Sequence, residues 1–260
     1  MIFYSGNFYF NGIYSKSKSI CLASISSNIL NDYGLAYSEE VVLVKNRKSS
    51  SYYTQGENKV DSITLELYYV DENDSLLIWD DEKLKDTFNW LVSDDFLPFV
   101  SEDNLNLTYY LKATKIVKKF NYQQKGYLEV TFQPFSSFAY MEFKKPLTIQ
   151  DERNVYFYNY SNVEHDYAPI IELKNLGDES TILSMQNTNR KDEAFEITGL
   201  KKDQTVIVDM LTGVVQDILT KENLMSKCNL KFLKMSEGGC NIKFNGMCQV
   251  VFKAQFPIMV

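Results

Sequence analysis

The chain has 260 residues, of which 45% are hydrophobic and 23% charged, proportions that belong to a globular protein and not to a disordered one. Its net charge of −7 is spread over both halves, so neither half has the basic character of a nucleic-acid-binding domain. The start, MIFYSGNFYFNG, has no basic n-region and no unbroken apolar stretch, so we do not expect it to be a signal peptide. No run approaches the roughly 20 apolar residues of a membrane span. We therefore expect folding in a cytoplasm, with the four cysteines as free thiols.

The first half reads mainly as strands. After the aromatic start comes a polar stretch, KNRKSSSYYTQGENK (45–59), which we interpret as a protruding hairpin arm between strand-like runs. The alternating segments ITLELYYV (63–70) and YLEVTF (127–132) predict strands. The acidic run that begins at Asp71 lacks the pattern of a calcium loop and is predicted to be a turn.

One segment has helical spacing. Apolar residues at Leu84, Phe88, Leu91 and Val92 form a stripe, and acidic residues at 80–82 favour a helix start. We predict a short helix over about residues 82–92, packed on a sheet.

A later stretch combines lysines with aromatic residues and could bind a single nucleic-acid strand. We favour a pair of strands with one solvated face. The lysines are Lys112, Lys115, Lys118, Lys119 and Lys125.

The segment MEFKKPLTIQDER (141–153) carries a proline and mixed charges, and there we place a domain boundary, giving domains 1–145 and 146–260. Near the end, Asn245-Gly246 separates two alternating runs, which predicts a β-hairpin because a type I′ turn needs positive φ at both central residues.

Candidate reactive groups do not form a site. The single histidine, His165, lies in an extended segment whose neighbours point to opposite sides, so a solvated loop is the better interpretation. Cys228, Cys240 and Cys248 lack the close spacing of a zinc site, and we predict core thiols. We expect no catalytic residue, no metal, no cofactor and no enzymatic activity.

Taken together, the order of segments resembles that of the distal tail protein family of bacteriophages with non-contractile tails. In the first half the resemblance is carried by FYFNGIYS (8–15), the arm, the segment DTFNWLVSDDFLPF (86–99) and, most specifically, YLEVTFQPFSSFAY (127–140). The second half is similar to the galectin-like module of that family. There the resemblance is carried by APIIELKNLG (168–177), AFEITGLKKDQTVIVDMLTGVV (194–215), ENLMSKCNLKFLKMSEGGCNIKFNG (222–246) and CQVVFKAQF (248–256). Within it, Asp209 and Asp217 look like surface residues that flank a hairpin around Gly213.

The resemblance implies a mainly β protein: an N-terminal β-sandwich or barrel with one short helix and the arm, followed by a galectin-like β-sandwich. It implies a structural hub of the tail tip, a hexameric ring that joins the tail tube to adsorption components around a channel for DNA. The implied partners are further copies of the chain, the tail tube protein, tail-associated or tape-measure proteins and a receptor-binding or side-fibre protein, without specific nucleic-acid or membrane binding. The protein would be made in the host cytoplasm and reside in the virion tail tip.

The ring interface is expected on the arm, at Arg47, Lys48, Tyr52 and Tyr53. The alternative function is a carbohydrate-binding β-sandwich that attaches the virion to the host cell wall. An all-β hydrolase is a third possibility, for which the sequence offers no identifiable pair of carboxylates.

Overall fold

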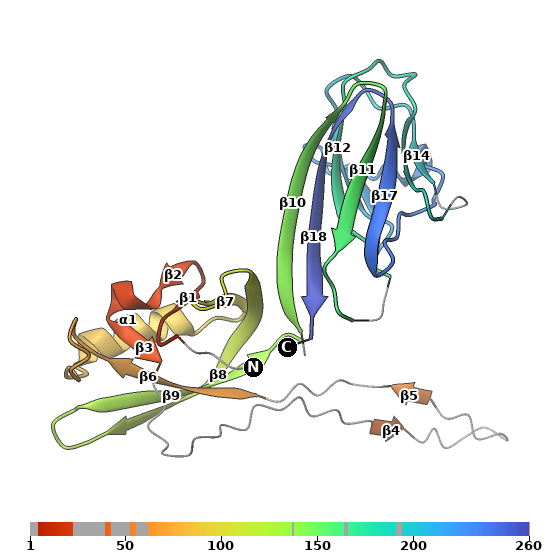
Figure 1. Ribbon diagram of the computed structural model, residues 1–260. Coiled ribbons are helices and arrows are strands. Elements are labelled where there is room, and N and C mark those ends of the chain that lie inside the picture. The colour runs from red at the N-terminus through yellow and green to blue at the C-terminus, as the bar shows by residue number, and fades with distance from the viewer. Residues whose placement is uncertain are drawn as a thin grey trace. The chain divides into compact units, whose positions relative to one another are not determined.

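The computed structural model describes residues 5–22, 40–42, 53–55, 62–136, 138–163, 166–190 and 194–259. The chain forms two compact β-rich units, one ending at Ala139 and the other spanning Tyr140–Met259 (Figure 1). Between them there is no loop: the expected boundary after residue 145 lies within a continuous strand, β10 (Ala139–Ile149). Among the described residues, no helix has the length and apolarity needed to cross a bilayer.

The first unit is built on antiparallel strands. From β8, the sheet continues on one side through β7, β1 and β2. On its other side β8 pairs with β9, which pairs with β6, and β6 pairs with β3. A 3-10 turn, Ser15–Lys18, follows β2. The strands are β1 (Phe8–Phe10), β2 (Ile13–Tyr14), β3 (Ile20–Leu22), β6 (Ile63–Tyr69), β7 (Leu97–Ser101), β8 (Leu107–Phe120) and β9 (Gly126–Pro134).

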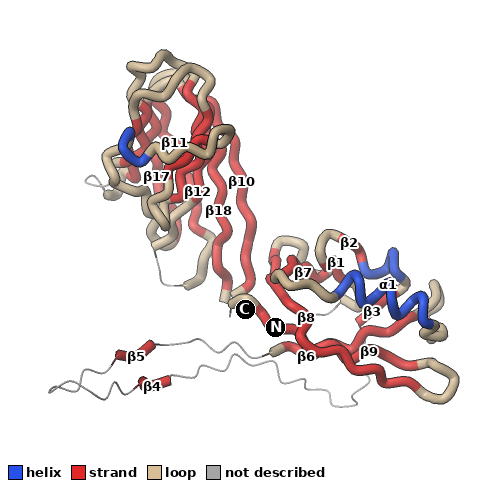
Figure 2. The backbone as a smooth tube through the Cα atoms, turned by 180° about the vertical axis from the view of Figure 1, so that it is seen from behind, coloured by secondary structure: helices blue, strands red, loops and turns tan. Residues whose placement is uncertain are grey.

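The predicted helix is present as α1 (Asp81–Leu91), blue in Figure 2. Asp80 caps it, because its side chain accepts a hydrogen bond from the backbone N–H of Lys83 at 2.7 Å. The prediction that Val92 belongs to the apolar stripe is wrong. The helix ends at Leu91 and the backbone of Val92 is extended, so its side chain is 59% exposed. Trp90 takes the buried position instead.

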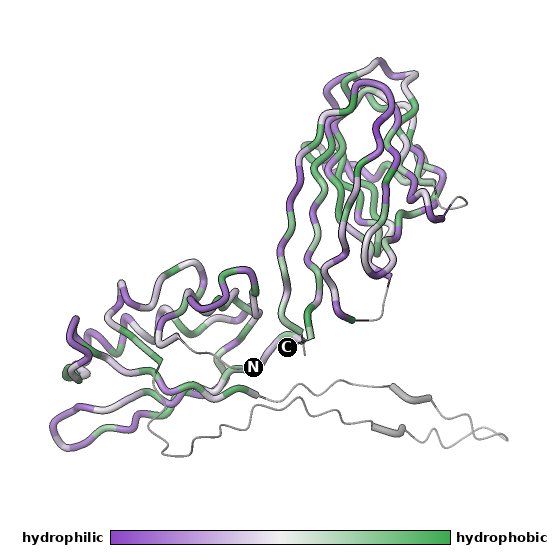
Figure 3. Tube along the Cα trace, in the orientation of Figure 1, coloured by the Kyte–Doolittle hydropathy of each residue, from purple (hydrophilic) through white to green (hydrophobic). Residues whose placement is uncertain are grey.

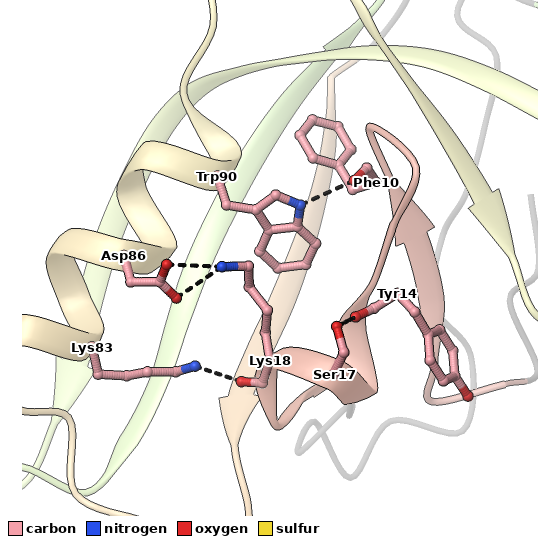
Figure 4. Close-up of polar contacts among 7 residues, drawn as sticks. All are labelled: Phe10, Tyr14, Ser17, Lys18, Lys83, Asp86 and Trp90. Carbon is pink, nitrogen blue, oxygen red and sulfur yellow. Dashed lines mark hydrogen bonds and ion pairs between the residues drawn. The ribbon is translucent and has the colours of Figure 1, made fainter.

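Polar contacts hold α1 against the start of the chain (Figure 4). The indole N–H of Trp90 donates to the carbonyl of Phe10 at 3.0 Å. Lys18 forms an ion pair with Asp86 at 2.8 Å. Around the indole, aromatic rings from β1 and β7 complete the core: Phe8 stacks on Trp90 at 5.7 Å and on Phe99 at 5.0 Å. The helix is therefore part of this unit's core.

The second unit is a sandwich of two antiparallel sheets, with strand orders β16-β15-β12-β18-β10 and β11-β17-β13-β14. Hydrophobic and hydrophilic residues alternate along its strands (Figure 3), and the buried ones form one core between the sheets. The remaining strands are β11 (Glu152–Asn159), β12 (Ile170–Asn175), β13 (Leu183–Asn187), β14 (Phe195–Ile197), β15 (Thr205–Asp209), β16 (Val215–Asp217), β17 (Gly238–Asn245) and β18 (Cys248–Ile258), with a 3-10 turn at Met225–Lys227.

The prediction of a hairpin at Asn245-Gly246 is wrong, although the strands on both sides of the turn are present. β17 pairs with β11 and β13, whereas β18 pairs with β12 in the other sheet, so the turn is an arch between sheets. Both edges of β17 are already occupied, which leaves β18 no place beside it. The connection between β10 and β11 also joins the two sheets, and the N–H of Gly246 donates to the carbonyl of Asp151 in it at 2.7 Å.

Candidate interaction surfaces

Asp209 stabilises a turn. It ends β15, which pairs with β16 in the hairpin expected around Gly213. Its carboxylate accepts hydrogen bonds from the backbone N–H groups of Leu211 at 2.9 Å and Thr212 at 3.1 Å. A carboxylate that satisfies the donors of its own turn acts as a local cap.

Asp217 does the same for the next turn. It was expected at the surface, but it is buried, with 5% of its surface exposed. One oxygen accepts from the N–H groups of Leu219 and Thr220, each at 2.8 Å, and the other accepts from Gln204 at 2.8 Å. The hydrogen bonds from the Thr220 backbone and the Gln204 side chain lower the pKa of Asp217 to about 2. At neutral pH it is an anion that organises a loop.

Glu102 organises the chain start in a similar way. Its carboxylate accepts from the Tyr14 hydroxyl at 2.7 Å, from Asn7 at 3.0 Å and from Ser5 at 2.9 Å. The bond to Glu102 raises the pKa of Tyr14 to about 12, and the same bond lowers the pKa of Glu102. An ionised acceptor next to a protonated phenol anchors the segment without activating a nucleophile.

Three cysteines were predicted to lie in the core. Cys240 and Cys248 do, each with 2% of its surface exposed, whereas Cys228 is only half-buried. Burial raises the pKa of the Cys248 thiol to about 11, which keeps it protonated at neutral pH. Across the described ranges, no group of three or more His, Cys, Asp or Glu side chains is placed to hold a metal ion. His165 lies outside those ranges.

Within the arm expected over residues 45–59, the structure describes one strand, β5 (Tyr53–Gln55). It pairs antiparallel with β4 (Glu40–Val42), which precedes the expected arm, in a register that places Val42 opposite Tyr53. Of the four residues expected at the ring interface, Tyr53 begins β5, while Arg47, Lys48 and Tyr52 lie outside the described residues.

An exposed aromatic pair on the first unit was missed by sequence reasoning. Phe96 and Phe135, 38% and 62% exposed, meet edge to face with ring centroids 5.4 Å apart. The sequence pattern of β9 could have indicated the exposure of Phe135. Alternation places Phe132 and Pro134 inward, so Phe135, one residue further, lies on the outer side. Large exposed aromatic side chains are enriched at protein interfaces.

The lysine-rich stretch forms the antiparallel pair β8 and β9, as predicted. Three of its five lysines contact other groups. Lys118 lies over the ring of Phe88 at 5.6 Å, Lys119 lies 3.8 Å from Glu129, and Lys112 donates to the carbonyl of Asp94 at 2.7 Å. Tyr122, at the turn between the strands, is 92% exposed.

A tyrosine row, defined here as Tyr156, Tyr158 and Tyr160, lies on and just after β11 in the second unit. The three side chains are 59%, 47% and 44% exposed, while Phe157 and Asn159 between them are buried. Alternation in VYFYNY could have revealed this row, because residues two apart in a strand share one face. β11 is also an edge strand of its sheet.

Comparison with known proteins gives matches along both units. Residues 3–134 match a family described as phage tail protein N-terminal domain, and residues 138–254 match one described as phage tail C-terminal domain. A relative from Bacillus subtilis (strain 168), the SPbeta prophage-derived uncharacterized protein YomH, is 25% identical over 231 residues, which are 85% of this chain and 88% of the relative.

Among solved structures, this chain is similar to the Dit (gp 19.1) protein of phage SPP1, with a TM-score of 0.59 and 11% identity. The match covers 98% of this chain and 100% of the Dit chain, and that structure is described as a paradigm of the hub adsorption apparatus in phages that infect Gram-positive hosts. At this identity the likeness concerns the fold, and it confirms the Dit-like, mainly β architecture expected from the sequence.

Proposed function

Since this chain belongs to a family of phage tail proteins, through both its N-terminal and its C-terminal domain, we propose that it is a distal tail protein, a structural hub of the tail tip. The observation that carries the proposal is the similarity in fold to the SPP1 Dit hub protein over essentially the full length of both chains. A match that spans both units supports the role of the whole chain and not that of one module.

In this function, six copies form a ring that joins the tail tube to the adsorption components and leaves a central channel for DNA. A closed ring needs two different complementary surfaces on each copy. The first unit offers the β4–β5 strand pair and the exposed Phe96–Phe135 pair as interface elements. An aromatic pair of this kind can be buried by a neighbouring copy and contribute an anchor.

The proposed partners follow from that position. They are the tail tube protein on one side, tail-associated or tape-measure proteins, and a receptor-binding or side-fibre protein. The hub function requires no catalysis and no specific nucleic-acid contact. In support, three lysines of β8, Lys112, Lys118 and Lys119, each contact another group of the first unit. Assembly would follow folding in the host cytoplasm.

The test is the mass of the purified protein by light scattering. A hexamer of 30.2 kDa chains has a mass of about 181 kDa, six times the chain mass. We expect deletion of residues 46–58 to give a folded monomer. Phe135→Ala should shift the equilibrium toward monomer, and the matched control Leu105→Ala, whose side chain is equally exposed at 62%, should not. A ring of unchanged size after the deletion contradicts the proposal.

A further inference from the structure

The edge strands of the second unit are not treated alike. β14 and β16, each at one end of its sheet, are covered by the chain's own backbone. The Asn229 N–H donates to the carbonyl of Glu196 in β14 at 3.0 Å, and the Leu224 N–H donates to the carbonyl of Val215 in β16 at 2.8 Å. Covering an edge in this way prevents its backbone groups from pairing with other chains. Within the part of the chain that the structure describes, β11 pairs with β17 on one side and with no strand on the other.

The hydrogen-bond register of β11 identifies the backbone groups at this open edge. Pairing with β17 runs without a shift over all eight residues of β11. In an antiparallel pair, consecutive residues direct their N–H and C=O groups alternately to the two sides of the strand. The carbonyl of Asp151 accepts from Gly246, which follows β17, at 2.7 Å, so the odd-numbered residues of β11 bond to β17. The Thr188 N–H donates to the carbonyl of Asn241 on the β13 side of β17, which gives the same assignment.

The outward groups therefore belong to the even-numbered residues Glu152, Asn154, Tyr156 and Tyr158. Each contributes one N–H donor and one C=O acceptor. β11 contains no proline, and its pairing with β17 contains no bulge, the two features that commonly make an edge unsuitable for further pairing. The edge is thus long and regular enough to accept an added strand.

The tyrosine row leaves this edge accessible. A Cβ atom built on Gly239 of β17 would lie 2.6 Å from Cζ of Tyr156 and closer still to its hydroxyl oxygen. The ring of Tyr156 therefore leans over the bare backbone of β17, away from the open edge. The rings of Tyr158 and Tyr160 meet edge to face with centroids 5.0 Å apart, and Tyr160 contacts the buried Phe256 at 5.8 Å. The row is held in place beside the edge without covering its N–H and C=O groups.

These features indicate the chemistry of the occupant. Regularly spaced backbone donors and acceptors match the backbone of another extended chain. The tyrosine row beside them matches apolar or aromatic side chains at alternate positions of that chain, because aromatic and β-branched pairs across strands stabilise a sheet. A second copy of β11 does not fit a ring. Two identical edges pair about a two-fold axis, whereas copies in a closed ring meet through two different surfaces.

We propose that the open edge of β11 receives an extended strand from another protein of the tail. This inference rests on the hub function proposed above. The donated strand bonds to the outward N–H and C=O groups of Asn154, Tyr156 and Tyr158, and its alternate apolar or aromatic side chains pack on the tyrosine row. It has no proline at the bonding positions, because proline has no N–H to donate. Main-chain hydrogen bonds supply the affinity, and the alternate side chains supply the specificity.

The first test removes one outward N–H. In Asn154→Pro the lost N–H points away from β17, so the bonds between β11 and β17 remain, and proline is tolerated at such edge positions. Asn154→Ala changes the same exposed side chain but keeps the N–H, which makes it the matched control. We expect tails that carry Asn154→Pro to contain about tenfold less of one tail protein, by quantitative mass spectrometry. Tails that carry Asn154→Ala should contain the usual amount.

The second test is amide hydrogen exchange, which reports the edge without any substitution. In the free chain, the N–H groups of Asn154, Tyr156 and Tyr158 should exchange faster than those of Val155 and Phe157, which bond to β17. In purified tails, exchange of the three outward groups should slow by about tenfold or more, because the added strand protects them. The two inward groups should be protected in both states and serve as the internal control.

Several outcomes overturn the proposal. Equal protein content in tails with Asn154→Pro and Asn154→Ala does so, as does fast exchange of the outward groups in tails that contain the chain. Loss of the tail protein from both variants assigns the contact to the side chain and not to an added strand. A two-fold dimer of the free chain that Asn154→Pro dissociates shows that a second copy covers the edge.

The hub function is tested separately from the added strand. Light scattering and circular dichroism of the Asn154→Pro chain should show an unchanged ring and an unchanged β-rich spectrum. A ring that stays intact while the edge remains unprotected in tails contradicts the added strand alone. Absence of the chain from purified tails contradicts the hub function, and the added strand with it.

Discussion

Asp217 shows how a single charged residue stabilises the second unit. The side chain is buried at the end of β16, yet both its oxygens accept hydrogen bonds, from two backbone N–H groups and from Gln204. A buried carboxylate is tolerated when donors replace its lost water. These donors come from the loop that follows the strand and from the β14–β15 connection, so the charge ties two loops together.

The lowered pKa of Asp217 predicts a pH-dependent contribution to stability. The folded-state pKa is about 2, whereas an unfolded aspartate titrates near 3.9. A group whose pKa is lowered by folding stabilises the protein above the unfolded pKa and loses that contribution as the pH falls through the folded pKa. The contribution should therefore be complete above about pH 4 and disappear toward pH 2.

The variant Asp217→Asn tests this. It keeps the shape but replaces one acceptor oxygen with a donor that faces Gln204, so we expect a loss of about 1–2 kcal/mol in the free energy of unfolding at pH 7. Urea unfolding of both proteins at several pH values should show the difference shrinking below pH 4. Glu179→Gln, at an exposed carboxylate of the same unit, is the control. A difference that stays constant down to pH 2 would show that the charge is not responsible.

Among the elements, the arch at Asn245-Gly246 determines how the second unit is connected. Gly246 has φ of +94°, and a Cβ there would lie 2.6 Å from the carbonyl oxygen of Ile182. Glycine is required for two separate reasons, the backbone conformation and the approach of another backbone. Gly238, at the start of β17, has φ of +79° but nothing within 4 Å of its Cβ position.

These two glycines give a matched pair of variants. Gly238→Ala introduces only conformational strain, which we expect to cost about 1 kcal/mol of unfolding free energy. Gly246→Ala adds a clash with backbone that cannot move aside, and we expect a cost of about 2–4 kcal/mol. Thermal unfolding followed by circular dichroism measures both. Equal losses would mean that the close approach at Ile182 contributes nothing.

For the whole molecule, each unit has its own hydrophobic core. The buried cluster of the second unit begins at Leu147 and ends at Phe256, and every member lies within that unit. The first unit has its own aromatic core around Trp90 and Phe99. Two separate cores are the usual mark of two folding domains.

We therefore expect residues 140–260, expressed alone, to fold. Circular dichroism should show a β-rich spectrum, and heating should give one cooperative transition. The matched comparison is a fragment of residues 147–260, which lacks most of β10 and so exposes β18, its neighbour in the sheet. If the longer fragment gave no transition, the second unit would depend on the first. In that case the division after Ala139 would not separate two folding domains.

Much of this protein's secondary structure follows from the local sequence pattern. The positions of α1, β6 and β9 could be predicted because alternation and helical spacing are properties of neighbouring residues. The β15–β16 hairpin was expected from the family resemblance. The resemblance to the phage tail family, and with it the Dit-like fold, could also be recognised from the sequence, because it depends on the order of short segments along the chain. Local pattern also marked Cys240 and Cys248 as core positions.

Three features were decided by tertiary structure. Asn245-Gly246 connects two sheets and not two neighbouring strands, because both edges of β17 were taken by β11 and β13. Asp217 is buried, and Gln204 reaches it from another loop to donate a hydrogen bond. The support of Tyr156 by Gly239 depends on which strand pairs with β11. A turn has the same sequence whether its strands pair with each other or elsewhere, so only the contacts between distant segments settle which partner each strand takes.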